Sequence, residues 1–129
     1  MQTLLSSRFF QATFLAILGA ISVFGFAPYY FYPASIFSIA GLTAFWLKSE
    51  NIKAAAWQGF IFALGFFGFG IYWIYISLHD FGGMPPLMAG LATFLLCAFM
   101  ASFTALFGAL AFLFKQKSLA HIIAIAIFW

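Results

Sequence analysis

The sequence predicts an all-α integral membrane protein, a bundle of transmembrane helices with four complete spans and the start of a fifth. Apolar residues make up 67% of the 129 positions, and charged residues only 5%. A soluble domain carries about 25% charged residues because its surface faces water. The apolar residues also gather in runs close to the ~20 residues that a helix needs to cross a ~30 Å hydrocarbon core. Five lysines and arginines and two acidic residues cannot coat a soluble globule of this length.

The apolar runs place all spans in one transmembrane domain, residues 1–129. The expected spans cover residues 9–27, 30–47, 54–78, 86–114 and 119–129. The fourth run is long enough to tilt or to extend into the headgroups. Eleven residues rise only ~16 Å as a helix, so the fifth run would end midway across the membrane. We therefore expect a longer protein of which this is the N-terminal portion. The competing interpretation is a half-spanning or re-entrant last segment.

The connections between the runs carry turn signals. All four prolines fall in predicted turns, two within 26–33 and two within 79–86. Proline lacks a backbone N–H and interrupts helices, and the Gly-Gly pair at 82–83 is a second turn signal. The segments 48–53 and 115–118 are short, polar and cationic.

The cations predict the orientation. If the helices alternate in direction, all lysines and arginines lie on one side of the membrane: Arg8, Lys48, Lys53, Lys115 and Lys117. Because cytoplasmic loops are enriched in lysine and arginine, we expect a cytoplasmic N-terminus. The turns at 26–33 and 79–86 would then face the other side. The cations form no dense patch, which excludes a nucleic-acid-binding surface.

Aromatic residues and small residues predict the environment of the helices. Tyr29, Tyr30 and Tyr32 are expected at the outer interface, and Trp46 and Trp57 at the inner one, because tyrosine and tryptophan favour the headgroup level. Small residues let membrane helices approach closely. Those of the third run are Gly59, Gly65, Gly68 and Gly70; those of the fourth form a stripe of Ala98, Ser102, Ala105 and Ala109, extended by Ala101, Thr104 and Gly108. A groove for a lipid chain is the functional alternative to plain helix packing.

Few residues could carry chemistry. His79 and Asp80 are adjacent in an outer turn, and His121 stands alone, so interfacial roles are favoured over catalysis. Cys97 lies inside an apolar run, where a thiolate is disfavoured. No spacing of metal ligands or phosphate-binding loop is present, and we expect no metal and no cofactor. The centres of the predicted spans lack ionisable residues, which disfavours an ion-coupled transporter.

Trp73 and Tyr75 precede the second outer turn and form the more informative pair. A buried Trp N–H or Tyr O–H needs a hydrogen-bond partner. An outer aromatic belt is the simpler interpretation. Contact with a lipid headgroup or a docked domain is the functional one.

Three stretches resemble the N-terminal membrane part of bacterial apolipoprotein N-acyltransferases, a family of nitrilase-related acyltransferases. They are Gly25-Phe26-Ala27-Pro28-Tyr29 with Pro33, then Gly59-Phe60 with the run from Gly65 to Ser77, and Phe81-Gly82-Gly83-Met84-Pro85. Their order and spacing are similar to the family from about Leu18 to Phe114. Each short motif alone is weak, and the ordered set carries the resemblance.

The resemblance implies an enzyme of eight transmembrane helices with a periplasmic nitrilase-like domain between the last two. That domain would use a Glu-Lys-Cys triad to transfer a phospholipid acyl chain, through a Cys thioester, to the N-terminal diacylglyceryl-cysteine of a lipoprotein. The triad is expected beyond residue 129, and Cys97 cannot replace its cysteine. By itself the present chain is thus expected to be inactive.

The resemblance also implies partners and location. The expected partners are a membrane phospholipid as acyl donor and a diacylglyceryl lipoprotein as acceptor, and the expected state is a monomer in the bacterial inner membrane with its active side in the periplasm. The candidate lipid- or domain-contacting residues are Trp73, Tyr75, Phe81, Gly82, Gly83, Met84 and Pro85. The alternative function is a small polytopic scaffold or a lipid or solute transporter component.

Overall fold

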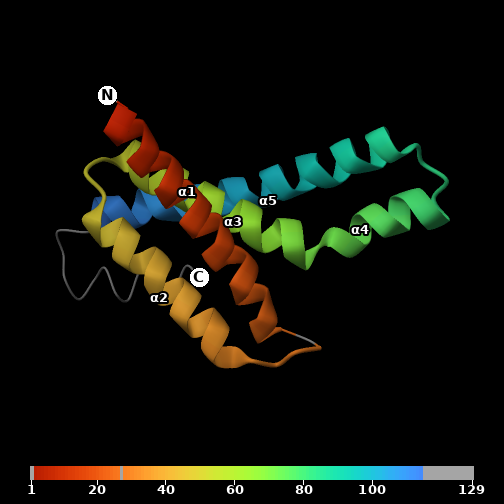
Figure 1. Cartoon of the computed structure of the whole chain (residues 1–129), viewed down its shortest axis with the longest axis horizontal. Helices are drawn as coiled ribbons and strands as arrows, with labels where there is room; N and C mark the ends of the chain where they lie inside the picture. Colours follow the sequence, from red (N-terminus) through yellow and green to blue (C-terminus); the bar gives the residue numbers. More distant parts are fainter. Residues whose placement is uncertain (1, 27, 115–129) are drawn as a thin grey trace.

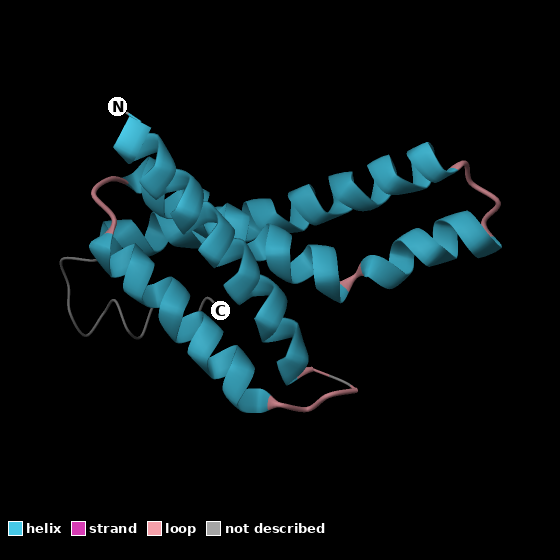
Figure 2. Cartoon of the chain, in the orientation of Figure 1, coloured by secondary structure: helices cyan, strands magenta, loops and turns pink. Residues whose placement is uncertain are grey.

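The computed structural model describes residues 2–26 and 28–114, and these contain helices and turns but no strand (Figures 1 and 2). The elements in chain order are α1 (Gln2–Ser22), the 3₁₀ turn η1 (Val23–Gly25), α2 (Tyr32–Lys48), α3 (Ile52–Gly70), α4 (Tyr72–Ile76), the π-helical turn η2 (Ser77–Phe81) and α5 (Pro86–Phe114). The all-helical class predicted from composition is confirmed for these residues. The predicted run 119–129 lies outside them.

Within residues 2–26 and 28–114, three helical stretches rather than four are long and apolar enough to cross a membrane. They cover residues 7–25, 52–70 and 86–113. The prediction of four complete spans is not confirmed, because α2 has 17 residues and rises only about 25 Å at ~1.5 Å per residue. It begins at Tyr32, not at Tyr30, because Tyr30 has a left-handed backbone conformation (φ 52°).

The third predicted run, 54–78, is not one helix. α3 ends at Gly70, and the chain leaves helical geometry at Ile71 (φ −110°, ψ 18°) before α4 begins. The amide of Ile71 still bonds to Phe67 O at 2.9 Å, and the amide of Ile74 bonds to Ile71 O at 2.9 Å. Glycine weakens a helix interior by roughly 0.5–1 kcal/mol relative to alanine, and Gly68 and Gly70 lie at this break.

The start of α1, the turn between α2 and α3, and the described end of α5 lie at one end of the bundle (Figure 1). The α1–α2 turn, at the bottom of the view, and the α4–α5 turn, at the far right, lie away from that end and apart from each other. Asn51 caps the start of α3, its side-chain oxygen accepting from the amide of Ala54 at 2.8 Å. This cap satisfies one of the amides that a helix start leaves unpaired.

α3 is the central helix and packs on α5 and on α1. Its two contact faces use different glycines. A Cβ on Gly59 would lie 2.6 Å from Thr104 O of α5, and a Cβ on Gly65 would overlap Ala16 O of α1. Gly19 of α1 likewise faces Phe62 O of α3 at a distance that excludes a side chain. Close backbone approach through small residues is therefore the packing principle of both interfaces.

The buried stripe of α5 differs from the predicted one. The buried positions of α5 are Ala89, Cys97, Ala101, Thr104, Gly108 and Ala111. Ser102 of the predicted stripe is exposed, and Ala98, Ala105 and Ala109 are only partly buried. The residues expected merely to extend the stripe form its centre, because Gly59 and the Ala55 carbonyl of α3 face Thr104 and Gly108.

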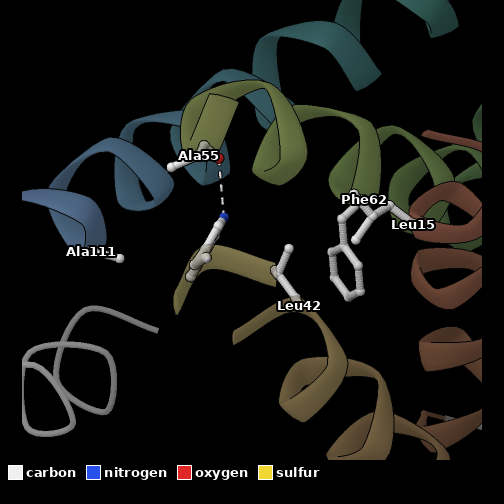
Figure 3. Packing of buried hydrophobic residues seen from close by; sticks show 6 residues of the cluster. Leu15, Leu42, Ala55, Phe62 and Ala111 are labelled. Carbon is white, nitrogen blue, oxygen red and sulfur yellow. Dashed lines mark hydrogen bonds between the residues drawn. The ribbon is translucent and has the colours of Figure 1, made fainter. Parts of the chain in front are cut away.

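The core lies where α1, α2, α3 and α5 meet. Its buried residues are Leu15, Leu42, Trp46, Ala55, Phe62 and Ala111 (Figure 3). Trp46 is 2% exposed, and its indole N–H donates to Ala55 O at 3.0 Å. The prediction that Trp46 belongs to an interfacial aromatic belt is thus wrong, since its polar edge is satisfied inside the bundle. Trp57, by contrast, is 59% exposed.

Candidate functional site

The candidate residues gather in a helical hairpin that projects from the bundle. α4 and η2 form one arm and the start of α5 forms the other, and in Figure 1 their turn is the part of the molecule farthest from α1 and α2. Neither α4 nor η2 contains a buried residue. The hairpin is therefore a surface on which side chains can meet lipid or another protein segment.

The Phe81–Pro85 segment is a turn held by backbone hydrogen bonds. The amide of Gly82 bonds to Ser77 O at 2.9 Å, which closes the π-helical turn, and the amide of Met84 bonds to Leu78 O at 3.0 Å. A Cβ on Gly82 would lie 2.7 Å from Leu78 O, and Gly83 has φ +64°. Both glycines are thus required by the backbone: the first for lack of space and the second for its left-handed conformation. Their presence has a structural explanation independent of any ligand.

Trp73 and Tyr75 do not form a pair. They are two positions apart in α4, so they lie on nearly opposite sides of the helix. Trp73 is 61% exposed and Phe81 is 87% exposed. Tyr75 is partly buried and stacks on other rings. The exposed aromatic side chains of the α4–η2 arm are therefore Tyr72, Trp73 and Phe81.

Tyr75 belongs to a column of three rings that sequence reasoning missed. Its ring centroid lies 6.2 Å from that of Tyr72, with the planes 21° apart, and 5.8 Å from that of His79. The spacing 72, 75, 79 places the rings on one helical face. That spacing is the signal in the sequence from which the column could have been predicted.

His79 is held in a defined tautomer. Its Nδ1 lies 2.9 Å from Met84 O. Because a carbonyl oxygen only accepts, Nδ1 must carry the proton and Nε2 of the neutral ring is an acceptor. Nε2 faces Asp80 Oδ1 at 3.9 Å, and the two side chains are 38% and 57% exposed. The hairpin therefore presents an imidazole nitrogen and a carboxylate side by side.

The α1–α2 turn presents a second group of aromatic side chains. Tyr29, Tyr30 and Tyr32 are each about 60% exposed, as expected for an interfacial position. Phe26 connects this turn to α3, with its ring centroid 5.7 Å from that of Phe66. Ser35 Oγ donates to Ser22 O at 2.7 Å and joins α2 to the end of α1.

Residues 2–26 and 28–114 include one histidine and one cysteine, His79 and Cys97. These residues contain no group of three or more His, Cys, Asp or Glu side chains that could hold a metal ion. Cys97 is 5% exposed on the packed face of α5, and residues 86–114 contain no acidic or basic side chain. Cys97 is a small packing residue, without a base or an oxyanion donor from its own helix.

Residues 18–129 match the family described as the apolipoprotein N-acyltransferase N-terminal domain. The chain belongs to this family. An apolipoprotein N-acyltransferase of Nitrosomonas europaea is 48% identical over 91 residues, which cover 70% of this chain and 18% of that protein. One of Ralstonia nicotianae is 40% identical over 97 residues, covering 75% of this chain and 18% of that protein. One of Coxiella burnetii is 39% identical over 112 residues, covering 87% and 23% respectively.

The matched region of the apolipoprotein N-acyltransferase N-terminal domain includes the whole projecting hairpin and the glycine contacts of α3 and α5. The resemblance inferred from the three short motifs is thus confirmed. The chain spans about a fifth of the length of the curated relatives it matches. Family membership and three apolar helices of sufficient length together indicate a membrane protein.

Proposed function

We propose that the chain is the membrane-anchoring and lipid-access part of an enzyme that N-acylates lipoproteins. The observation that carries the proposal is the family match over residues 18–129. The proposal places the chemistry in a part of the enzyme outside these 129 residues. On this proposal the chain alone is inactive.

The reaction proposed for the whole enzyme is acyl transfer in two steps. A cysteine thiolate attacks the acyl ester of a phospholipid, forming a thioester and releasing the lysophospholipid. The α-amine of a diacylglyceryl-cysteine then attacks the thioester, forming an amide and releasing the cysteine. A glutamate would act as general base and a lysine would stabilise the oxyanion, the usual division of labour in acyl transfer. All three would belong to a nitrilase-like domain outside these 129 residues.

The proposed location is the bacterial inner membrane, with the N-terminus in the cytoplasm and the hairpin on the periplasmic side. Arg8, Lys48 and Lys53 support this orientation, because they belong to the end of the bundle that holds the N-terminus and the α2–α3 turn (Figure 1). Lysine and arginine mark the cytoplasmic side of membrane proteins. Lys115 and Lys117 lie outside the described residues.

The hairpin is the part of the chain that we assign to lipid access. It carries exposed aromatic side chains at Tyr72, Trp73 and Phe81, and tyrosine and tryptophan favour the headgroup level. α5 has 29 residues and rises about 43 Å, which exceeds a ~30 Å hydrocarbon core. The start of α5 and the α4–η2 arm would thus reach the level of the headgroups, beside a periplasmic catalytic domain.

A chimera tests the proposal. The aligned N-terminal segment of the Nitrosomonas europaea relative would be replaced by this chain, and N-acylation of a diacylglyceryl lipopeptide would be measured in phospholipid vesicles. We expect the chimera to acylate and the 129-residue chain alone to give no product. A chimera that inserts and folds but forms no amide would overturn the anchoring and access role, and product from the chain alone would overturn its expected inactivity.

Trp73→Ala in this chimera should lower kcat/KM at least about tenfold, since one lost contact of about 1.4 kcal/mol has that effect. The side chain is exposed, so the unfolding free energy should stay within about 0.5 kcal/mol. Trp57→Ala is the matched control, because Trp57 is equally exposed on α3 near the other end. Equal activity of Trp73→Ala and the control would assign Trp73 to the aromatic belt alone.

A further inference from the structure

When the His79 ring is neutral, no hydrogen bond joins its Nε2 atom to the Asp80 carboxylate, because both groups are acceptors. The Met84 carbonyl fixes the proton of neutral His79 on Nδ1, so Nε2 points a lone pair toward Asp80 Oδ1, 3.9 Å away. Two acceptors cannot hydrogen-bond to each other, and because the two side chains are 38% and 57% exposed, a donor from outside can reach both. An ammonium group is such a donor, and its positive charge complements the carboxylate.

The described residues offer Asp80 no other cationic partner. Arg8, Lys48 and Lys53 belong to the opposite end of the bundle (Figure 1). α5, the helix packed against α4 and η2, contains no acidic or basic side chain from 86 to 114. The titratable groups nearest to His79 in the same arm are Asp80, Tyr75 and Tyr72. A negative charge therefore stands at the tip of an apolar hairpin with only His79 beside it.

We propose that His79 Nε2 and the Asp80 carboxylate form a binding subsite for a primary ammonium group. An ammonium carries several N–H donors, and charge-assisted N–H···O bonds are about 2.7–2.9 Å long, so acceptors 3.9 Å apart are within reach of one nitrogen. A metal ion is a poorer occupant, because no third His, Cys, Asp or Glu joins the pair among the described residues.

The source of the ammonium rests on the proposed function, which supplies two candidates. One is the ethanolamine headgroup of a donor phospholipid, and the other is the α-amine of the acceptor lipopeptide. A choline headgroup bears no N–H and cannot donate to either acceptor. The subsite would therefore distinguish ethanolamine from choline lipids, a selection that the exposed aromatic residues alone would not make.

The test measures binding without catalysis, so that it stays independent of the acyl-transfer proposal. The 129-residue chain would be reconstituted in phosphatidylcholine nanodiscs and titrated with phosphatidylethanolamine or with an amino-terminal lipopeptide. Retained ligand would be counted by native mass spectrometry, and the ¹⁵N shift of His79 Nε2 would be followed by NMR. We expect saturable binding of one amine-bearing ligand per chain, accompanied by a change at Nε2.

Two variants separate the subsite from the turn. Asp80→Asn keeps the side-chain shape and removes the charge, and should weaken binding about tenfold or more, as loss of a charge-assisted hydrogen bond predicts. His79→Asn keeps a donor for Met84 O near the Nδ1 position and removes the Nε2 acceptor, so binding should fall by a similar factor while the turn is kept. A Met84 carbonyl ¹³C shift that is unchanged in both variants would show that the turn is intact.

The binding results for different ligands distinguish the two sources of the ammonium group, and one set of results would overturn the proposal. Binding of phosphatidylethanolamine assigns the subsite to the donor headgroup, and binding of the lipopeptide but not its N-acetylated form assigns it to the acceptor. Equal retention of phosphatidylethanolamine and added labelled phosphatidylcholine, together with no binding of the lipopeptide, would overturn the subsite. A change at Nε2 that follows pH alone would also overturn it, since His79 and Asp80 would then form only an internal ion pair.

Discussion

Gly108→Ala should cost the folded chain about 2–3 kcal/mol, although it adds a single methyl group. A Cβ at Gly108 would overlap Ala55 O of α3 and lie 3.0 Å from Trp46 Nε1. The obstructing atoms are a helix carbonyl and a buried indole, and neither can rotate away. The α3–α5 pair would have to separate, and overpacking of this kind typically costs 1–3 kcal/mol. Because packing is the main force between membrane helices, a small separation is expensive.

Gly90→Ala is the matched control in the same helix. No atom lies within 4 Å of a Cβ at Gly90, so alanine should be neutral or stabilise α5 by up to about 1 kcal/mol through its higher helix propensity. Unfolding of both variants would be followed by circular dichroism in detergent as denaturant is added. Equal stabilities of the two variants would contradict the close crossing of α3 and α5 at Gly108.

Trp46→Ala should be the second severely destabilising change, at about 3 kcal/mol or more. The indole is 2% exposed and donates to Ala55 O at 3.0 Å. A Cβ added to Gly59 of α3 or to Gly108 of α5 would lie 3.2 Å or 3.0 Å from it. Its removal would leave a cavity at the meeting point of three helices, and buried Trp→Ala changes cost about 3–5 kcal/mol in soluble cores. The lower figure is expected here, because lipid competes with the core for apolar groups.

Two further variants resolve the origin of that cost. Trp46→Phe keeps most of the packing and removes the N–H, so it should cost about 1 kcal/mol for the hydrogen bond plus part of the volume loss. Trp57→Ala, at an exposed tryptophan, should change the unfolding free energy by no more than about 0.5 kcal/mol. A large effect of Trp57→Ala with none of Trp46→Ala would show that Trp57 anchors the fold.

Features that depend on one residue or one short segment, such as turns, could be predicted from the sequence. Pro85 lies in the predicted turn and Pro86 begins α5 where the fourth run was expected to begin, whereas Pro33, expected in a turn, lies in the first turn of α2. The Gly82-Gly83 pair marked a turn because the backbone there has no space for a Cβ at the first position and is left-handed at the second. The ordered motifs between Gly25 and Pro85 identified the family for the same reason, since they are local features.

The break in the helix at Ile71 and the column of three rings in the hairpin could not be predicted in this way. The run 54–78 is apolar throughout, and hydropathy does not report where an apolar helix stops. The column of Tyr72, Tyr75 and His79 depends on the arm after Ile71 adopting its own helical register. The tautomer of His79 depends on Met84, which a turn brings back to it.

Length and hydropathy in the sequence by themselves determined the helical class, the membrane environment and the positions of the turns. Only the tertiary structure decided which face of each helix is buried: Trp46 lies in the core, and α5 packs through Ala101, Thr104 and Gly108. The physical reason is that lipid is as apolar as the protein interior. In a water-soluble protein, a polar face marks the outside of a helix. Here both faces of each helix are apolar. The face that is buried is therefore decided by packing between glycines, backbone carbonyls and one indole.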